Sequence, residues 1–240
     1  QAEDGIRDRS PSRGLGDVYK RQAIRQSVSY FVPRIEKVMH IKEFEVIDLR
    51  VPTSDNLLGS DPFHRKPNYS VVLTKLFGSN GLEGISVNFT IGAGTDWVAY
   101  SVKDLMQLIV ERSLDEFTND PGGFHRMLLD HHQLRWLGDG MGRMVIGSVM
   151  NSLWDLWAKE EDKPLWKLLV DLPPKTIIDC IDWRYLKDAL DPAEALEILE
   201  KGLASKTERE QRTSQKGPKA YSTAGWLGLS DNEIVKTIEE

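Results

Sequence analysis

Residues 125–132 hold the side chains whose types and spacing best suit a metal ion, namely His125, Asp130, His131 and His132. Imidazole nitrogens and carboxylate oxygens are common metal ligands in proteins. Adjacent histidines, however, project in different directions from a helix, and no second carboxylate stands nearby at ligand spacing. We therefore expect solvated surface histidines here and no metal centre.

Two further patterns can also suggest chemistry. The Gly92-Ala93-Gly94 run is a weak phosphate-loop motif, because no lysine follows at nucleotide-loop spacing. We expect a loop in which Thr95 or Asp96 caps the next helix. Cys180 is the single cysteine and lies in an apolar run, so it predicts a buried structural thiol and excludes an internal disulfide.

The stretch Thr53–Asn68 is long for a hairpin connection. Long loops in compact domains are often functional. A solvated surface loop is the alternative interpretation, and the residues alone leave both open.

The elements that must position these segments follow from hydrophobic periodicity. Apolar and β-branched residues predict strands over 44–51, 69–77 and 82–90, with a turn at Gly78–Gly81, which together suggest a small antiparallel meander. Val98–Arg112 has helical spacing. Met144–Asp171 predicts a buried helix followed by a shorter one opened by Pro164, and its three tryptophans are expected to bury a large area.

A second region follows Pro173-Pro174, which prevents the helix from continuing. Apolar runs predict buried strands at Thr176–Trp183 and Tyr221–Leu227. Asp191-Pro192 and Ser230–Glu233 have the composition of helix starts, and Lys201–Lys219 predicts a solvated arm or a long helix end. Strand followed by helix is the repeat of a (β/α)₈ barrel.

Composition narrows the function classes. The chain has 240 residues, of which 40% are hydrophobic and 28% charged, with a net charge of −6. This mild acidity argues against a nucleic-acid partner, and no apolar run reaches the length of a membrane span. Gln1–Gln22 has no periodic apolar face and resembles a translated sequencing-adaptor prefix. Ala23–Arg34 lacks acids, so a transit-peptide remnant and an untranslated leader both stay open.

Several motifs together resemble one family. They are N-S-L-W-D-L-W-A-K at Asn151–Lys159, K-P-L-W-K-L-L at Lys163–Leu169, D-L-R-V-P-T-S at Asp48–Ser54, N-F-T-I-G-A-G at Asn88–Gly94, Q-L-R-W at Gln133–Trp136, C-I-D-W-R-Y at Cys180–Tyr185 and Y-S-T-A-G-W-L-G at Tyr221–Gly228. Their order resembles the mandelate racemase/muconate lactonising branch of the enolase superfamily, and within it the sugar-acid dehydratases of the L-fuconate dehydratase type. The resemblance covers roughly Glu43 to Glu240.

The resemblance implies a fold class and domain limits. We expect an α+β N-terminal capping domain over residues 43–172, with an antiparallel meander plus helices. The start of a truncated (β/α) barrel should follow over 173–240. Residues 1–42 are expected to be a disordered or artefactual leader.

The resemblance also implies site residues. The loop Thr53–Asn68 matches the mobile loop that closes over substrate, and the family's substrate contacts fall on Gly59, Ser60, Asp61 and Tyr69. Glycine lets the backbone approach a ligand closely. Asp61 can accept hydrogen bonds from sugar hydroxyls, and Tyr69 can donate a hydrogen bond to a carboxylate. Pro62 and Phe63 replace the small residue and methionine common in relatives, which leaves the sugar acid undetermined. Trp97, in the family's second specificity loop, is a weaker candidate for the pocket mouth.

The resemblance finally implies a reaction. A complete protein of this type abstracts the proton next to a carboxylate and expels the β-hydroxyl with the help of Mg²⁺, giving a 2-keto-3-deoxy acid. The catalytic groups and magnesium ligands would lie beyond Glu240, so no catalytic or metal residue is assigned, Lys236 included, and the fragment is expected to be inactive. A non-catalytic interaction fragment, or another acid-sugar enzyme such as a galactonate dehydratase, stays open. So do homo-oligomerisation and a cytoplasmic or mitochondrial location.

Overall fold

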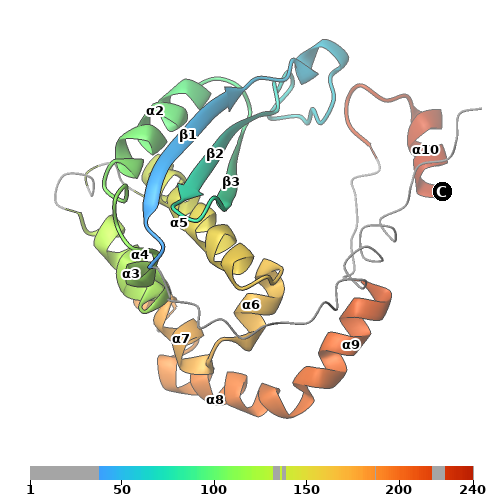
Figure 1. Cartoon of the computed structure of the whole chain (residues 1–240). Coiled ribbons are helices and arrows are strands. Elements are labelled where there is room, and N and C mark those ends of the chain that lie inside the picture. Colours follow the sequence, from blue (N-terminus) through green and yellow to red (C-terminus); the bar gives the residue numbers. More distant parts are fainter. Residues whose placement is uncertain (1–37, 132–135, 137–138, 187, 218–224, 240) are drawn as a thin grey trace, which may run out of the picture. The chain divides into compact units, whose positions relative to one another are not determined.

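The structure of the 240-residue chain is a computed structural model that describes residues 38–131, 136, 139–186, 188–217 and 225–239. Three strands form one antiparallel sheet in the order β1-β2-β3 (Figure 1): β1 (Ile41–Leu49), β2 (Ser70–Gly78) and β3 (Glu83–Thr90). The predicted meander is thus confirmed, with β1 beginning at Ile41. The turn before β3 contains Gly81 at φ 85°, a conformation that favours glycine.

Nine helices stand among the described residues: α2 (Thr95–Met106), α3 (Leu114–Thr118), α4 (Pro121–Leu129), α5 (Met141–Glu160), α6 (Leu165–Asp171), α7 (Pro174–Asp179), α8 (Pro192–Gly202), α9 (Lys206–Lys216) and α10 (Asp231–Glu239). The helix predicted over Val98–Arg112 ends at Met106. The amide of Glu111 donates to the Ile41 carbonyl at 2.7 Å, so this segment pairs with the start of β1 instead of continuing the helix.

Helix α5 lies across one face of the sheet, with α2 beside it (Figure 1). Its predicted apolar face is confirmed, since Val149, Leu153 and Leu156 are fully buried. Phe117 of α3 packs edge-on against Trp154 and Trp157. The third tryptophan, Trp166, is half-exposed, so the expectation that all three bury a large area is wrong for this residue.

A buried polar seam joins α5 to the sheet, and the hydrophobic pattern gave no indication of it. The hydroxyl of Ser148 lies 2.9 Å from that of Thr74, and Ser86 donates to the Ser148 carbonyl at 2.7 Å. A Cβ on Gly84 would lie 2.1 Å from the Ser152 carbonyl oxygen. Small residues therefore let the helix backbone approach β3 closely, and the hydroxyls satisfy one another where water is excluded.

The predicted strand Thr176–Trp183 is wrong. Residues 174–179 form α7, and Trp183–Tyr185 form a 3₁₀ turn. Pro174 stands at the first helical position, and Lys175 pairs with Asp179 one turn later. A short apolar run does not distinguish a strand from a helix, and here the proline favours the helix.

The C-terminal region also contains two predicted helix starts and a second predicted strand. Asp191 caps α8 through the amides of Ala193 and Glu194, and Ser230 with Glu233 caps α10, so both predicted helix starts are confirmed. Most of the predicted strand Tyr221–Leu227 lies outside the described residues, and residues 225–227 are not in a strand.

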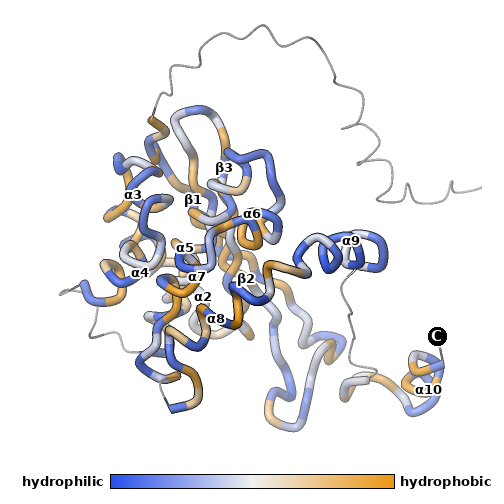
Figure 2. Tube along the Cα trace, turned by 90° about the horizontal axis from the view of Figure 1, so that it is seen from below, coloured by the Kyte–Doolittle hydropathy of each residue, from blue (hydrophilic) through white to orange (hydrophobic). Residues whose placement is uncertain are grey.

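Helix α9 is hydrophilic along its length and mostly exposed (Figure 2), as predicted for a solvated arm. It is tied to α6 because Lys206 and Lys167 both lie 2.8 Å from Asp171 Oδ1. Hydrogen bonds from Lys167 and Lys206 hold the pKa of Asp171 well below its usual range. Within the described ranges, no helix is long and apolar enough to cross a membrane.

Candidate functional site

The loop between β1 and β2 is closed at its base by side chains. Thr53 donates its hydroxyl proton to the Pro67 carbonyl at 2.8 Å and accepts from the Tyr69 amide at 2.8 Å. The Ser54 amide donates to Asn68 Oδ1 at 3.2 Å. These bonds join the two ends of the loop across about fourteen residues, so its tip is held on a fixed stem.

The middle of the loop is clamped by two of the expected site residues. Tyr69 donates its hydroxyl proton to the Gly59 carbonyl at 2.5 Å, while its ring packs edge-on against Phe89 at 5.0 Å. Gly59 has φ 71°, and a Cβ there would lie 2.2 Å from the Tyr69 ring. The structure therefore brings Gly59 and Tyr69 together, and the hydroxyl proposed for a ligand is used inside the loop.

Ser60 faces inward. Only 3% of its surface is exposed, and its hydroxyl donates to the Leu57 carbonyl at 2.6 Å. The Ser60 carbonyl accepts a long 3.4 Å hydrogen bond from the amide of Leu227. In this arrangement the residue supports the loop and does not present its side chain outward.

Asp61 organises the loop tip. Its Oδ1 accepts from the amides of Phe63 and His64, each at 2.7 Å, and its Oδ2 lies 3.1 Å from His64 Nδ1. Hydrogen bonds from the amide and then the imidazole of His64 lower the pKa of Asp61. The carboxylate is therefore ionised at neutral pH, and both of its oxygens are engaged within the tip.

The second loop lies beside the first. The Asn68 amide donates to the Ile91 carbonyl at 3.1 Å, and Arg50 Nη1 donates to the Gly92 carbonyl at 2.5 Å. The expected helix cap at Thr95 or Asp96 is wrong, because the N-cap is Gly94 at φ 82°. Thr95 instead donates to Gly92 and is buried. Trp97 is 69% exposed, so its place at a pocket mouth stays a prediction.

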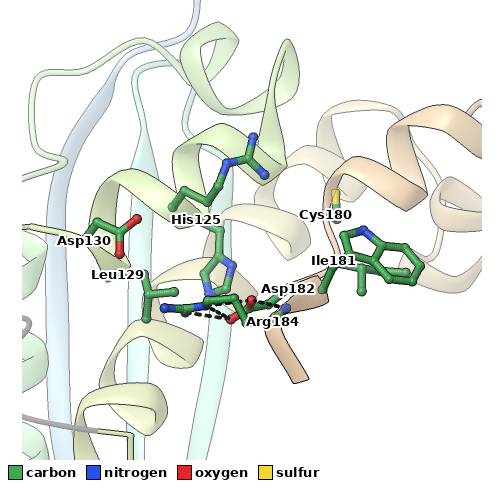
Figure 3. A pocket seen from close by; sticks show the side chains of 9 residues that line it. His125, Leu129, Asp130, Cys180, Ile181, Asp182 and Arg184 are labelled. Carbon is green, nitrogen blue, oxygen red and sulfur yellow. Dashed lines mark hydrogen bonds and ion pairs between the residues drawn. The ribbon is translucent and has the colours of Figure 1, made fainter. Parts of the chain in front are cut away.

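A separate cavity of about 300 Å³ lies between α4 and residues 180–184 (Figure 3). His125 lines it and is half-buried, so the expectation of a solvated histidine is wrong at this position. Burial and the neighbouring Arg143 lower the pKa of His125. Asp182 lies 2.7 Å from Arg184 and 3.3 Å from Arg143, and the hydrogen bond from Arg184 holds its pKa well below the usual range.

Cys180 also lines this cavity. It is half-buried, and burial followed by the charge of Asp179 raises the pKa of its thiol. The protonated thiol is a poor nucleophile, which agrees with a structural role. His132 lies outside the described residues.

A larger cavity of about 770 Å³ lies between α6–α7 and α8–α9. Its walls include Trp154, Trp166, Ile177 and Leu203. Its wall from α9 also carries charged side chains, among them Lys206 and Glu210, which form ion pairs with Asp171 and Lys167 of α6. The loop between β1 and β2 is retained as the candidate site because the sequence resemblance assigns the substrate contacts to it.

The described residues hold no cluster of three histidine, cysteine or acidic side chains that could bind a metal ion. The part of the chain that the structure shows therefore does not fit the magnesium ion that the sequence resemblance implies.

Comparisons with known proteins identify the fold. The N-terminal domain family of mandelate racemase and muconate lactonizing enzyme matches residues 61–170. Human mitochondrial enolase superfamily member 1 is 41% identical over 199 residues, covering 81% of this chain and 45% of that protein. L-galactonate dehydratase from Hypocrea jecorina is 34% identical over 204 residues, covering 83% of this chain and 45% of that protein.

The crystal structure of the human mitochondrial protein superimposes with a TM-score of 0.79 at 38% identity, covering 84% of this chain and 47% of that one. The chain thus spans about half the length of the relatives it matches. Its meander and helices correspond to the N-terminal capping domain of such enzymes. The chain therefore belongs to the mandelate racemase/muconate lactonizing enzyme branch of the enolase superfamily and carries its N-terminal domain.

Proposed function

We propose that this chain is the N-terminal part of a magnesium-dependent sugar-acid dehydratase, and that its loop between β1 and β2 closes over the substrate. The observation that carries the proposal is the loop's construction. A stem fixed by Thr53 and a clamp between Tyr69 and Gly59 hold a polar tip at the end of the sheet. Similarity to an L-galactonate dehydratase supports the substrate class.

The proposed reaction removes the proton next to the carboxylate and then the β-hydroxyl as water, leaving a 2-keto-3-deoxy acid. The contribution of this chain is to enclose the substrate, exclude water and fix its orientation. In the proposed enzyme, the magnesium ligands and the catalytic base are residues outside this chain, as the resemblance implies.

The test begins with the native transcript, read beyond the codon for Glu240. The encoded polypeptide is then incubated with Mg²⁺ and L-galactonate, or with its 6-deoxy analogue L-fuconate, and the 2-keto-3-deoxy product is measured. We expect product from the longer polypeptide and none from the 240-residue chain alone. A stop codon after Glu240, or the absence of product with both acids, overturns the proposal for this gene product.

A further inference from the structure

The loop tip presents one side chain that the expected site residues did not include. Asp61 and His64 close a tight turn in both directions, because the Asp61 amide donates to the His64 carbonyl at 3.1 Å and the His64 amide donates to Asp61 Oδ1 at 2.7 Å. The second carboxylate oxygen then holds the imidazole at Nδ1. Backbone and side chain of His64 are thus both fixed by one acid.

This arrangement determines what the imidazole can offer. An ionised carboxylate only accepts hydrogen bonds, so Nδ1 of His64 carries the proton in the pair. In the neutral ring Nε2 then has the free lone pair and accepts from an incoming hydroxyl. The His64 side chain is 51% exposed, so its outer edge is accessible to a ligand.

The neighbouring charges favour an anionic ligand. Arg65 and Lys66 follow His64 directly and are exposed. Across the described ranges neither has a hydrogen-bond or ion-pair partner, and the nearby Asp61 is already engaged. An excess of positive charge at a loop tip raises the local concentration of a small acid before it binds.

We propose that His64 is a further residue of this loop that contacts substrate, accepting a hydrogen bond from a hydroxyl of a sugar acid through Nε2. Asp61 is a positioning residue that sets the tautomer and orientation of the ring. The inference rests on the proposed function, since it assigns a role within the same site.

The test uses the polypeptide encoded by the extended transcript, with Mg²⁺ and L-galactonate. We expect His64→Ala to raise KM about tenfold with a smaller change in kcat, because one hydrogen bond to bound substrate is lost. His64→Gln, whose amide oxygen can still accept near the Nε2 position, should recover part of the loss. Asp61→Asn should raise KM about threefold, because the ring loses the carboxylate that holds its Nδ1 proton.

His40→Ala is the matched control, because this exposed histidine lies at the opposite end of β2 from the loop, beside Gly78 and Ser79. It should leave KM unchanged. A KM for His64→Ala within twofold of the unaltered protein overturns the inference and leaves the proposed function standing. Failure of the unaltered protein to bind or convert sugar acids overturns both.

Discussion

The Tyr69 hydroxyl donates a 2.5 Å hydrogen bond to the carbonyl of Gly59, ten residues earlier in the chain. The two residues act as the closing pair of one loop, and Phe89 supports the tyrosine ring from β3. Positions that resemblance assigned separately to a ligand therefore depend on each other. The contact restricts the conformations open to the loop, which lowers the entropy lost on binding.

Gly59→Ala should disrupt this clamp. The new Cβ would lie 2.2 Å from the Tyr69 ring, at a backbone φ of 71° that itself costs about 1–2 kcal/mol for alanine. We expect faster tryptic cleavage after Arg65, measured by mass spectrometry of the early fragments; the Lys66–Pro67 bond resists trypsin.

Gly81→Ala is the control that separates the backbone strain of a positive φ from the clash with the Tyr69 ring. Gly81 has φ 85°, but no atom lies within 4 Å of its added Cβ. It should therefore cost only the backbone strain and leave cleavage at the loop unchanged. Equal cleavage of the loop in both variants would contradict the clamp.

The buried hydroxyls between Thr74 and Ser148 should be energetically coupled. Ser148→Ala leaves the buried Thr74 hydroxyl without its partner, at a cost of about 1–3 kcal/mol in the free energy of unfolding. Thr74→Val should cost less, because the Ser148 hydroxyl still lies 3.1 Å from that of Ser86. The double variant should lose less than the sum of the two, as measured by urea denaturation. Strict additivity would show that the 2.9 Å contact carries no coupling.

Acid should weaken the contact between α4 and residues 180–184. The folded pKa of His125 lies below its unfolded value of about 6.5, so the unfolded state binds the proton first. The contribution of neutral His125 is present above that pH and is lost as the pH falls through it. His125→Gln should flatten the decrease in unfolding free energy between about pH 7 and 5.

His40→Gln provides the comparison, since His40 is an exposed histidine outside this cavity. Identical pH profiles for the His125 variant and the unaltered chain would refute the role of burial at His125.

The outer face of the sheet should bind a hydrophobic dye in the 240-residue chain. Leu49 of β1 and Val87 and Phe89 of β3 are each at least 41% exposed, and Leu49 and Phe89 both pair with Val71 of the central strand β2. Val87→Lys should reduce dye fluorescence and self-association. A clean monomer with a sharp, cooperative melt and no dye binding would contradict this expectation.

Periodicity identified the sheet and α5 because each has one continuous buried face. Val72, Thr74 and Leu76 alternate with half-buried neighbours along β2, and this period of two is visible in the sequence. The strand predicted over residues 176–183 was wrong because a short apolar run fits both a strand and a helix. Pro174, at the first helical position, favours the helix.

The candidate site was only partly predictable. Resemblance identified the loop, but hydrogen bonds between distant positions decide where each side chain points. The Thr53 stem, the Tyr69 clamp and the Ser148 seam all depend on such contacts. An Asp three residues before a histidine in a turn is a local pattern that could have drawn attention to His64.

The most direct test of the account is hydrogen exchange at residues 53–69 in the polypeptide encoded by the extended transcript. Exchange is measured with Mg²⁺ alone, with L-galactonate added and with the uncharged polyol galactitol added. The account predicts slower exchange at Leu57–His64 with L-galactonate only, and no change at the distant turn Ser79–Gly81. Conversion of L-galactonate with no protection of the loop would contradict the claim that this loop closes over the substrate.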